Sequence, residues 1–401
     1  MKSKIIALAL FVFTATGVAF YPVYQSIGAT NTAALATPVV NPPTQDHSSI
    51  EVVFVLDTTG SMSGLIQAAK EKIWSIASTM ASAQSAPEIR MGLVAYRDRG
   101  DAYVTKVLDL SDDLDSMYAR LMDFQADGGG DGPESVNQAL HDAVHHLSWS
   151  QDQNTYKVVF LVGDAPPHMD YQDDVKYPDT LAVAVKKGIV VNAIQSGQNQ
   201  TTAAGWQQIA QLGQGRYFQV AQAGNAVAIA TPFDKKIALL SEKLDHTRLY
   251  YGDAEEKEKQ QSKVDATDKL HATSSFASRA RRAVFNTSSS GKTNFLGEGE
   301  LVDDIASGRV ELSGIDKDQL PASMQAMAPA QQQALIEETA QRRNELQRQI
   351  EKLSDKRSDF LKKKVEETGG AGDSLDEKIY SAVREQAGRK GLRYEADAAA
   401  Y

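Results

Sequence analysis

The chain has 401 residues, a formal net charge of −10 and no cysteine. This length allows one medium domain with appendages, or two small domains. The lack of cysteine excludes disulfides, zinc–thiolate sites, cysteine nucleophiles and lipid-modified cysteines. The negative charge argues against a general nucleic-acid-binding protein, and it agrees with a surface that binds cations.

The first thirty residues carry the pattern of an export signal. Lys2 and Lys4 precede an apolar run at 5–13 and then small residues suited to cleavage. We therefore interpret 1–28 as a signal peptide or, if it is not cleaved, as an N-terminal membrane anchor, although the run is short for a full span. A linker follows at 29–49. The rest of the protein is expected in the periplasm, on the cell surface or outside the cell.

The first strong structural signal is an apolar run followed by oxygen-bearing side chains. Residues 52–56 predict a strand that is buried on both faces. Asp57, Thr59 and Ser61 then follow at every second position of the turn. One carboxylate and two hydroxyls are typical ligands of Mg²⁺, Mn²⁺ or Ca²⁺. Alternatively, the turn only caps the next helix, because Ser and Thr are good N-caps.

Two later segments favour the metal site. Residues 157–164 repeat the design of a buried strand that ends in an acid, here Asp164. In open parallel sheets ligands collect at the carboxyl ends of the strands, so Asp57 and Asp164 meet if their strands are neighbours. The glycine-rich loop 127–135 lies between them in sequence, and we expect it to bring Asp131 to the same point.

These motifs carry a family resemblance. Asp57-x-Thr59-x-Ser61 resembles the first part of the metal-ion-dependent adhesion site (MIDAS) of von Willebrand factor A (VWA) domains, and Asp164 resembles its distal acid. The segments Gly-Gly-Gly-Asp-x-Pro-Glu and Gly-Asp-Ala-Pro-Pro-His look like those of hemicentin-type and alpha-kinase-associated VWA domains. The resemblance covers about 50–245. It implies a Rossmann-like fold, a bound cation and cell adhesion or protein binding.

The middle loop departs from the integrin-like pattern. Such domains have a threonine where this chain has Asp131. A third carboxylate neutralises more of the metal's charge and leaves less attraction for an acidic ligand residue. The resemblance therefore supports metal binding more strongly than integrin-style capture of a carboxylate. Mg²⁺ is the first expectation, with Ca²⁺ or Mn²⁺ as alternatives.

Helices and strands alternate through this stretch, which predicts an α/β domain with a doubly wound, mostly parallel sheet. Apolar residues recur at helical spacing in 63–83. Further helices are expected at 113–124, 134–148, 178–187 and 225–244, and strands at 90–97, 103–108, 157–163, 189–195 and 216–220.

Three further polar residues are candidates for the rim of the site. If the strand at 90–97 runs parallel to the first strand, Asp98 and Asp101 lie at the metal-bearing edge. Alternatively, they only satisfy amides of their turn. His168 follows Asp164 closely enough to sit on the rim. We do not expect it to bind the metal directly, because an oxygen-rich site for a hard cation rarely recruits one imidazole.

The expected helix at 134–148 carries His141, His145 and His146. The first two have the spacing of neighbours on one helix face. The acid of a zinc-protease motif does not lie between them in the required place. We therefore interpret all three as ordinary residues of a helix surface.

The C-terminal part has a different character. We expect a connector with a small structured element at 246–328, a long charged helix at 329–368, and a final helix and tail at 373–401. The polar stretch 253–292 suits an exposed connector or surface helix. The residues around 283–305 and the charged helix resemble the C-terminal part of bacterial secreted VWA-domain proteins. That resemblance indicates an architecture but no function.

The long helix has two interpretations. Apolar residues fit a coiled-coil pattern with Thr339, Arg343 and Arg357 at seam positions. A homo-oligomer through 329–368 is one interpretation. Docking of an amphipathic helix on its own domain or on a partner is favoured, because polar seam residues weaken a coiled coil.

The sequence thus predicts an exported, non-enzymatic binding protein. Its cation would be held by a set of five residues, and a protein partner would supply an acidic or other oxygen donor to the open coordination position. The expected ligands are Asp57, Thr59, Ser61, Asp131 and Asp164, with Asp98, Asp101 and His168 at the rim. The alternative is a metal-dependent hydrolase of phosphate esters, for which no motif offers a general base or nucleophile.

Overall fold

The structure is a computed structural model that describes residues 48–130, 132–223, 229–367 and 374–394. The expected export signal, almost all of the linker, and Asp131 lie outside the described residues. Within the described ranges, none of the helices combines the length and apolar character needed to cross a membrane.

In the described part of the chain, six strands form one sheet in the order β3-β2-β1-β4-β5-β6. All neighbours are parallel except β2 and β3. This arrangement confirms the predicted α/β class with a mostly parallel sheet. The strands are β1 (Ser49–Asp57), β2 (Glu88–Tyr96), β3 (Thr105–Ser111), β4 (Tyr156–Gly163), β5 (Ile189–Ser196) and β6 (Gln214–Val220).

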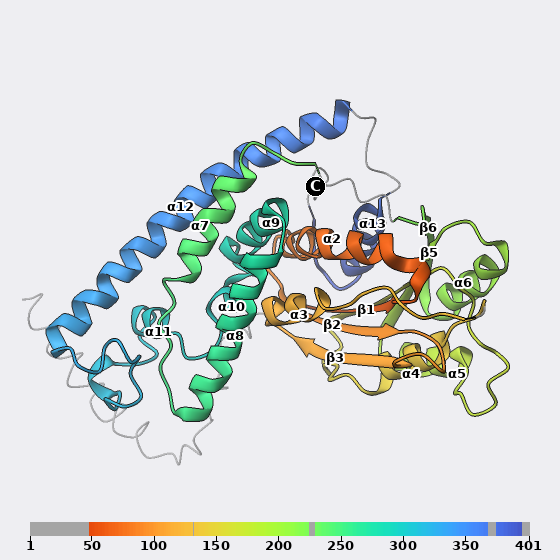
Figure 1. Cartoon of the computed structure of the whole chain (residues 1–401), viewed down its shortest axis with the longest axis horizontal. Helices are drawn as coiled ribbons and strands as arrows, with labels where there is room; N and C mark the ends of the chain where they lie inside the picture. Colours follow the sequence, from red (N-terminus) through yellow and green to blue (C-terminus); the bar gives the residue numbers. More distant parts are fainter. Residues whose placement is uncertain (1–47, 131, 224–228, 368–373, 395–401) are drawn as a thin grey trace, which may run out of the picture. The chain divides into compact units, whose positions relative to one another are not determined.

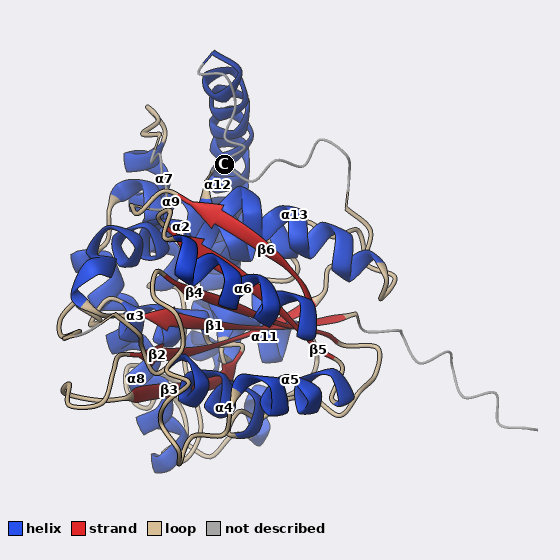
Figure 2. Cartoon of the chain, turned by 90° about the vertical axis from the view of Figure 1, so that its right-hand side faces the viewer, coloured by secondary structure: helices blue, strands red, loops and turns tan. Residues whose placement is uncertain are grey.

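Helices cover both faces of the sheet because alternate residues of each buried strand point to opposite sides. Val52 and Phe54 of β1 face one core, and Val53 and Val55 face the other. Figure 2 shows α2 and α13 on the opposite side of the sheet from α4 and α5. The first core contains α2 (Ser63–Ala81), α3 (Leu114–Leu121) and α13 (Leu375–Gly388), and the second contains α4 (Val136–His145), α5 (Tyr177–Lys186) and α6 (Gln200–Leu212).

The helical region follows the sheet in sequence. It consists of α7 (Asp234–Asp245), α8 (Ala254–Thr273), α9 (Phe276–Thr287), α10 (Lys292–Leu296), α11 (Leu301–Ala306) and α12 (Pro329–Glu367). Short 3-10 turns occur at η1 (Gly60–Met62) and η2 (Leu312–Gly314). The stretch 253–292 was expected to be exposed, but α9 is largely buried. Arg282 of α9 forms ion pairs with Asp115 of α3 at 2.5 Å and with Asp245 of α7 at 2.7 Å.

The long helix α12 docks on its own chain. Arg343 pairs with Glu300 at 2.8 Å and also donates to the carbonyl of Thr247, while Arg357 pairs with Asp234 at 2.8 Å. Apolar residues between these arginines pack with α7, α9 and α10 (Figure 1). The polar seam residues therefore have intramolecular partners. The homo-oligomer stays a prediction.

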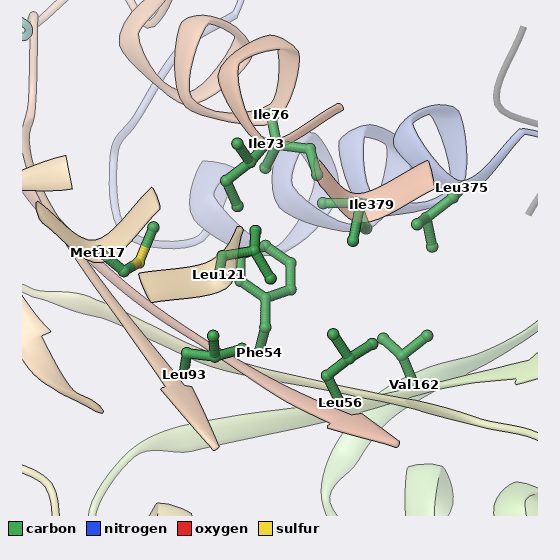
Figure 3. A pocket seen from close by; sticks show the side chains of 11 residues that line it. Phe54, Leu56, Ile73, Ile76, Leu93, Met117, Leu121, Val162, Leu375 and Ile379 are labelled. Atoms are coloured by element: carbon green, nitrogen blue, oxygen red, sulfur yellow. The ribbon is translucent and has the colours of Figure 1, made fainter. Parts of the chain in front are cut away.

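The C-terminal helix α13 lies on the same sheet face as α2. Its Leu375 and Ile379 point toward side chains of β1 and α2 and line a small apolar cavity with them (Figure 3). Buried Gln386 accepts a hydrogen bond from Tyr156 of β4 and donates to Asn192 of β5, both at 2.7 Å. The hydrophobic core therefore extends across the domain boundary expected at residue 245.

We expect Leu375→Ala to lower the free energy of unfolding by about 2–5 kcal/mol, because the truncation leaves unfilled space in a packed core. Leu239→Ala is the matched control, since Leu239 is 45% exposed whereas Leu375 is 3% exposed. The control should change stability by less than about 0.5 kcal/mol. Urea unfolding of the full chain measures both, and equal small effects would show that α13 is not part of the core.

Candidate metal centre

The carboxyl edge of the sheet brings the first and last predicted ligands together. Asp57 is the last residue of β1, and Asp164 directly follows β4, the parallel neighbour of β1. Asp57 is fully buried. Thr59 donates to its Oδ1 through both the backbone N–H (2.9 Å) and the hydroxyl (2.7 Å). The Thr59 hydroxyl also lies 3.4 Å from the Ser61 hydroxyl. Carboxylate and hydroxyl oxygens thus share one turn, as the motif spacing predicts.

Gln222, which follows β6, links the turn after β1 to Asp164 at the end of β4. Its Nε2 donates to Asp164 Oδ2 at 2.6 Å and to the carbonyl of Ser61 at 3.3 Å. Thr202 donates to the carbonyl of Asp164. Sequence reasoning did not identify Gln222, because no spacing rule links it to the earlier motifs.

Glu134 is a further acid that the sequence analysis did not select. It is 4% exposed. Its backbone is fixed to the Asp164 loop, since its N–H donates to the Pro166 carbonyl and its own carbonyl accepts from the His168 N–H. A Cβ placed on Gly129 would lie 3.2 Å from Thr59 Cβ and 3.4 Å from Glu134 Oε1. Glu134 and Thr59 therefore flank the same glycine.

The available signal for Glu134 was the Pro-Glu pair at the end of the glycine-rich loop. Asp131, the residue expected from this loop, lies outside the described residues. The predicted role of Asp131 remains a prediction. Glu134 is the carboxylate of this loop that the described structure places at the edge.

The electrostatics of the edge favour a cation. Burial raises the pKa of Asp57 to about 7, with a smaller contribution from the charge of Asp164, and the hydrogen bonds from Thr59 oppose this rise. Burial raises the pKa of Glu134 to about 9, and the charges of Asp57 and Asp98 add to the effect. These carboxyls therefore resist ionisation in the metal-free protein.

Two buried oxygens test whether the site fits a metal. Among the described residues, Asp57 Oδ2 and Glu134 Oε2 have no hydrogen-bond partner. Buried polar atoms are normally paired, so each such atom requires an explanation. A divalent cation would supply the missing positive charge, and an all-oxygen donor set suits Mg²⁺ or Ca²⁺. The residues present therefore fit a hard cation.

Because residue 163 is glycine, the end of β4 can pack closely against the side chains of Asp57 and Tyr96. A Cβ there would lie 3.1 Å from Asp57 Oδ2 and would clash with the Tyr96 hydroxyl. The Tyr96 hydroxyl is also buried without a hydrogen-bond partner in the described part of the chain. The buried Tyr96 side chain thus lies beside Gly163 and Asp57 on the protein-interior side of the site.

The predicted rim residues have different roles. Asp98 accepts hydrogen bonds from Ser135 at 2.8 Å and from Tyr171 at 2.9 Å. The ring of His168 lies between Asp98, at 3.3 Å, and Asp170, at 2.7 Å. Asp101 accepts from the N–H groups of Gly129 and Asp98, as the turn-amide alternative expected. Asp98, Asp101 and His168 thus fix the loops around the site.

Comparison with known proteins identifies the fold family of this segment. The family model described as "von Willebrand factor A domain" matches residues 51–232. This segment is a VWA domain. Asp57, Thr59 and Ser61 lie within it, at and directly after the carboxyl end of β1.

The curated relatives match over the VWA domain only. The "Alpha-protein kinase vwkA" of Dictyostelium discoideum is 28% identical over 120 residues, which cover 30% of this chain and 19% of that protein. The "Putative ariadne-like RING finger protein R811" of Acanthamoeba polyphaga mimivirus is 26% identical over 123 residues, which cover 31% of this chain and 12% of that protein. The chain thus spans less than a fifth of each relative.

Similar solved structures include proximal thread matrix protein 1 from the mussel byssus. It is 15% identical with a TM-score of 0.34, over 44% of this chain and 43% of that one. Another structure of that protein has a zinc-occupied MIDAS motif. The SpRpn10 VWA domain is 12% identical with a TM-score of 0.34, over 44% of this chain and 88% of that chain.

We expect the metal-free protein to lose stability as the pH rises from about 4 to about 9. The folded state holds protons on Asp57 and Glu134 up to pKa values of about 7 and about 9, whereas the unfolded chain releases them near the ordinary values of 3.8 and 4.5. The stabilisation is therefore complete below the unfolded values and is lost as the pH passes the folded ones.

Thermal unfolding in chelator across this pH range measures the effect. Glu134→Gln is the control, because it removes the titration near pH 9 and leaves that of Asp57. Parallel wild-type and Glu134→Gln profiles between the two pKa values would contradict the burial of an ionisable Glu134 at this edge.

Proposed function

We propose that the VWA domain binds a divalent cation at the carboxyl edge of its sheet and that the bound cation links the protein to a partner protein. The observation that carries the proposal is the pair of unpaired oxygens, Asp57 Oδ2 and Glu134 Oε2, buried beside two hydroxyls among the described residues. Asp57, Thr59, Ser61, Glu134 and Asp164 would hold the ion, some through water, with Asp131 as a further candidate from the same loop.

The donor set supports a hard cation. Its side-chain donors are carboxylate and hydroxyl oxygens, which Mg²⁺ and Ca²⁺ prefer over softer ions. Mg²⁺ is our first candidate. Each additional carboxylate favours Ca²⁺, since Ca²⁺ accepts more protein oxygens and a less regular geometry.

The surroundings support binding rather than hydrolysis. His168 is the imidazole of the rim, and its two ring nitrogens lie against Asp170 and Asp98. A general base has to reach the water or hydroxyl that it activates. His168 instead holds two loops in place. The cation would thus act as a charged anchor for an oxygen donor of the partner, and the rim would select the partner by shape and charge.

The place of action is part of the proposal. The basic and apolar N-terminal segment favours export, by cleavage or as an anchor. Binding would then occur outside the cytoplasm. Comparing the mass and location of the mature chain with those of the full sequence tests this point.

Asp57→Asn should weaken Mg²⁺ or Ca²⁺ binding by at least about tenfold, because it removes a charged ligand while preserving its shape. The metal-free mutant should be at least as stable as the wild type at neutral pH, because Asp57 is fully buried. Asp355→Asn, on the exposed face of α12, is the matched control. Calorimetric titration of the full chain measures both, and unchanged affinity in Asp57→Asn would refute the site.

A second pair of variants tests which acid of the glycine-rich loop binds the ion. If Glu134 is the ligand, Glu134→Gln should weaken cation binding by at least about tenfold and Asp131→Asn should have a smaller effect. A larger loss of cation affinity in Asp131→Asn than in Glu134→Gln would identify Asp131 as the ligand. Metal-dependent retention of a partner, measured by surface plasmon resonance with the full chain, should follow the same order. The full chain is required, because α13 contributes to the core of the sheet.

A further inference from the structure

The C-terminal half of α4 and the residue that follows it place two imidazoles beside one carboxylate. The sequence analysis interpreted His141, His145 and His146 as ordinary surface residues. The structure instead gathers His141, Asp142 and His146 so that one ligand atom of each lies within 4.8 Å of the others. This cluster is separate from the strand-edge site. Glu134 and Ser135 precede α4, and the cluster lies at the opposite end of this ten-residue helix, which is about 15 Å long.

The distances within the cluster fit a tetrahedral metal site. Asp142 Oδ1 lies 3.2 Å from His146 Nδ1 and 3.6 Å from His141 Nδ1. Around a tetrahedral Zn²⁺ with bonds of about 2.0–2.1 Å, neighbouring ligand atoms are about 3.3–3.4 Å apart. The two observed distances lie on either side of this value. The ligand atoms of the two imidazoles lie within 4.8 Å of each other, so side-chain movements would bring all three ligand atoms to one ion.

The carboxylate is fixed by neighbours that do not belong to the cluster. The side chain of Asp142 is 5% exposed. Its Oδ2 accepts from the Thr105 hydroxyl of β3 at 2.6 Å, and its Oδ1 accepts from Gln138 Nε2 at 2.7 Å. Such outer hydrogen bonds orient the ligands of metal sites and raise their affinity. Oδ1 retains a second lone pair for an ion.

The two imidazoles of the cluster can both reach a metal ion, because one ring nitrogen lacks a hydrogen-bond partner in the described part of the chain and the other ring is exposed to solvent. The ring of His141 stacks on that of His145 at a centroid distance of 4.3 Å. Among the described residues, His141 Nδ1 is buried without a hydrogen-bond partner. The side chain of His146 is 58% exposed, which leaves the cluster open to solvent. An ion could therefore enter, and a fourth ligand from outside could reach it.

We propose that His141, Asp142 and His146 form a second metal site that binds Zn²⁺ or another imidazole-preferring transition metal ion. Two imidazoles and one carboxylate are a common ligand set for Zn²⁺, and three protein ligands leave the fourth position for water or a donor from another molecule. The strand-edge site offers only oxygens, so the two sites differ in the metals that they prefer.

The test uses the full chain with Asp57→Asn, so that the strand-edge site does not contribute to the signal. Calorimetric titration with Zn²⁺ in the presence of excess Mg²⁺ should show one site. His141→Gln or His146→Gln should weaken it by at least about tenfold, and Thr105→Val by about 10–100-fold through its effect on Asp142. Co²⁺ should show the intense visible absorption of tetrahedral coordination, which the same variants should abolish.

His246→Gln is the matched control, because His246 is an exposed histidine at the end of another helix, α7. It should leave Zn²⁺ affinity unchanged. Circular dichroism and thermal unfolding verify that each variant is folded. Equal Zn²⁺ affinity in the His141, His146 and His246 variants, or no Zn²⁺ site in the Asp57→Asn chain, would overturn the proposal. In that case the contacts of His141 and His146 with Asp142 have a structural role only. The result is independent of the strand-edge site, which Asp57→Asn weakens and excess Mg²⁺ competes for.

Discussion

The burial of acidic side chains at the carboxyl edge of the sheet is the constraint around which this molecule is organised. The parallel register of β1 and β4 puts Asp57 and Asp164 together, and the loop before α4 adds Glu134. Burying a carboxylate without a counter-charge is unfavourable. The nearby cation Arg97 donates to the carbonyls of Thr58 and Gln125. Arg97 also lies 3.5 Å from the exposed carboxylate of Asp127. It therefore supports the surrounding loops, and in the proposed function the buried acids receive their counter-charge from a bound metal ion.

Two other buried acids, at the contact of α3, α7 and α9, have a positively charged partner within the chain. Although burial alone would raise the pKa of Asp115, the adjacent Arg282 guanidinium holds it below its ordinary value. Burial acts on Asp245 in the same way, and Arg282 and Arg248 outweigh it, so that its pKa is also lowered. Each acid here has an arginine partner within the chain. The contrast within one protein distinguishes structural ion pairs, which are already neutralised, from the strand edge, which is not.

The sequence predicted the features that depend on local periodicity. Apolar runs located β1 and β4, and the spacing of Asp57, Thr59 and Ser61 predicted that their oxygens share one turn. Their role as metal ligands stays a prediction. Helix α6 was not predicted, because its Gln- and Thr-rich sequence buries few large apolar side chains, chiefly Trp206 and Ile209. Features that depend on contacts distant in sequence were also missed. They include the burial of α9, the hydrogen bond between Gln222 and Asp164, and the position of α13 on the sheet.

Two further omissions have a different physical cause. Glu134 was within a motif that was recognised, but a loop without regular periodicity does not reveal which of its acids points inward. The cluster at His141 was judged by spacing along one helix. Its geometry depends on Asp142, which is oriented by Thr105 of a neighbouring strand. Tertiary contacts, which a one-dimensional pattern does not contain, therefore decided both cases.

The position of α13 has a consequence for the order in which the protein folds. β1 and α2 leave the ribosome long before residues 375–388, yet these residues cover part of the core that β1 and α2 begin. Until these residues emerge, the nascent sheet leaves part of that apolar face uncovered, a state prone to aggregation. The core of the VWA domain is thus discontinuous in sequence and is completed by α13. Proteolytic loss of that helix would uncover the same apolar face in the mature protein.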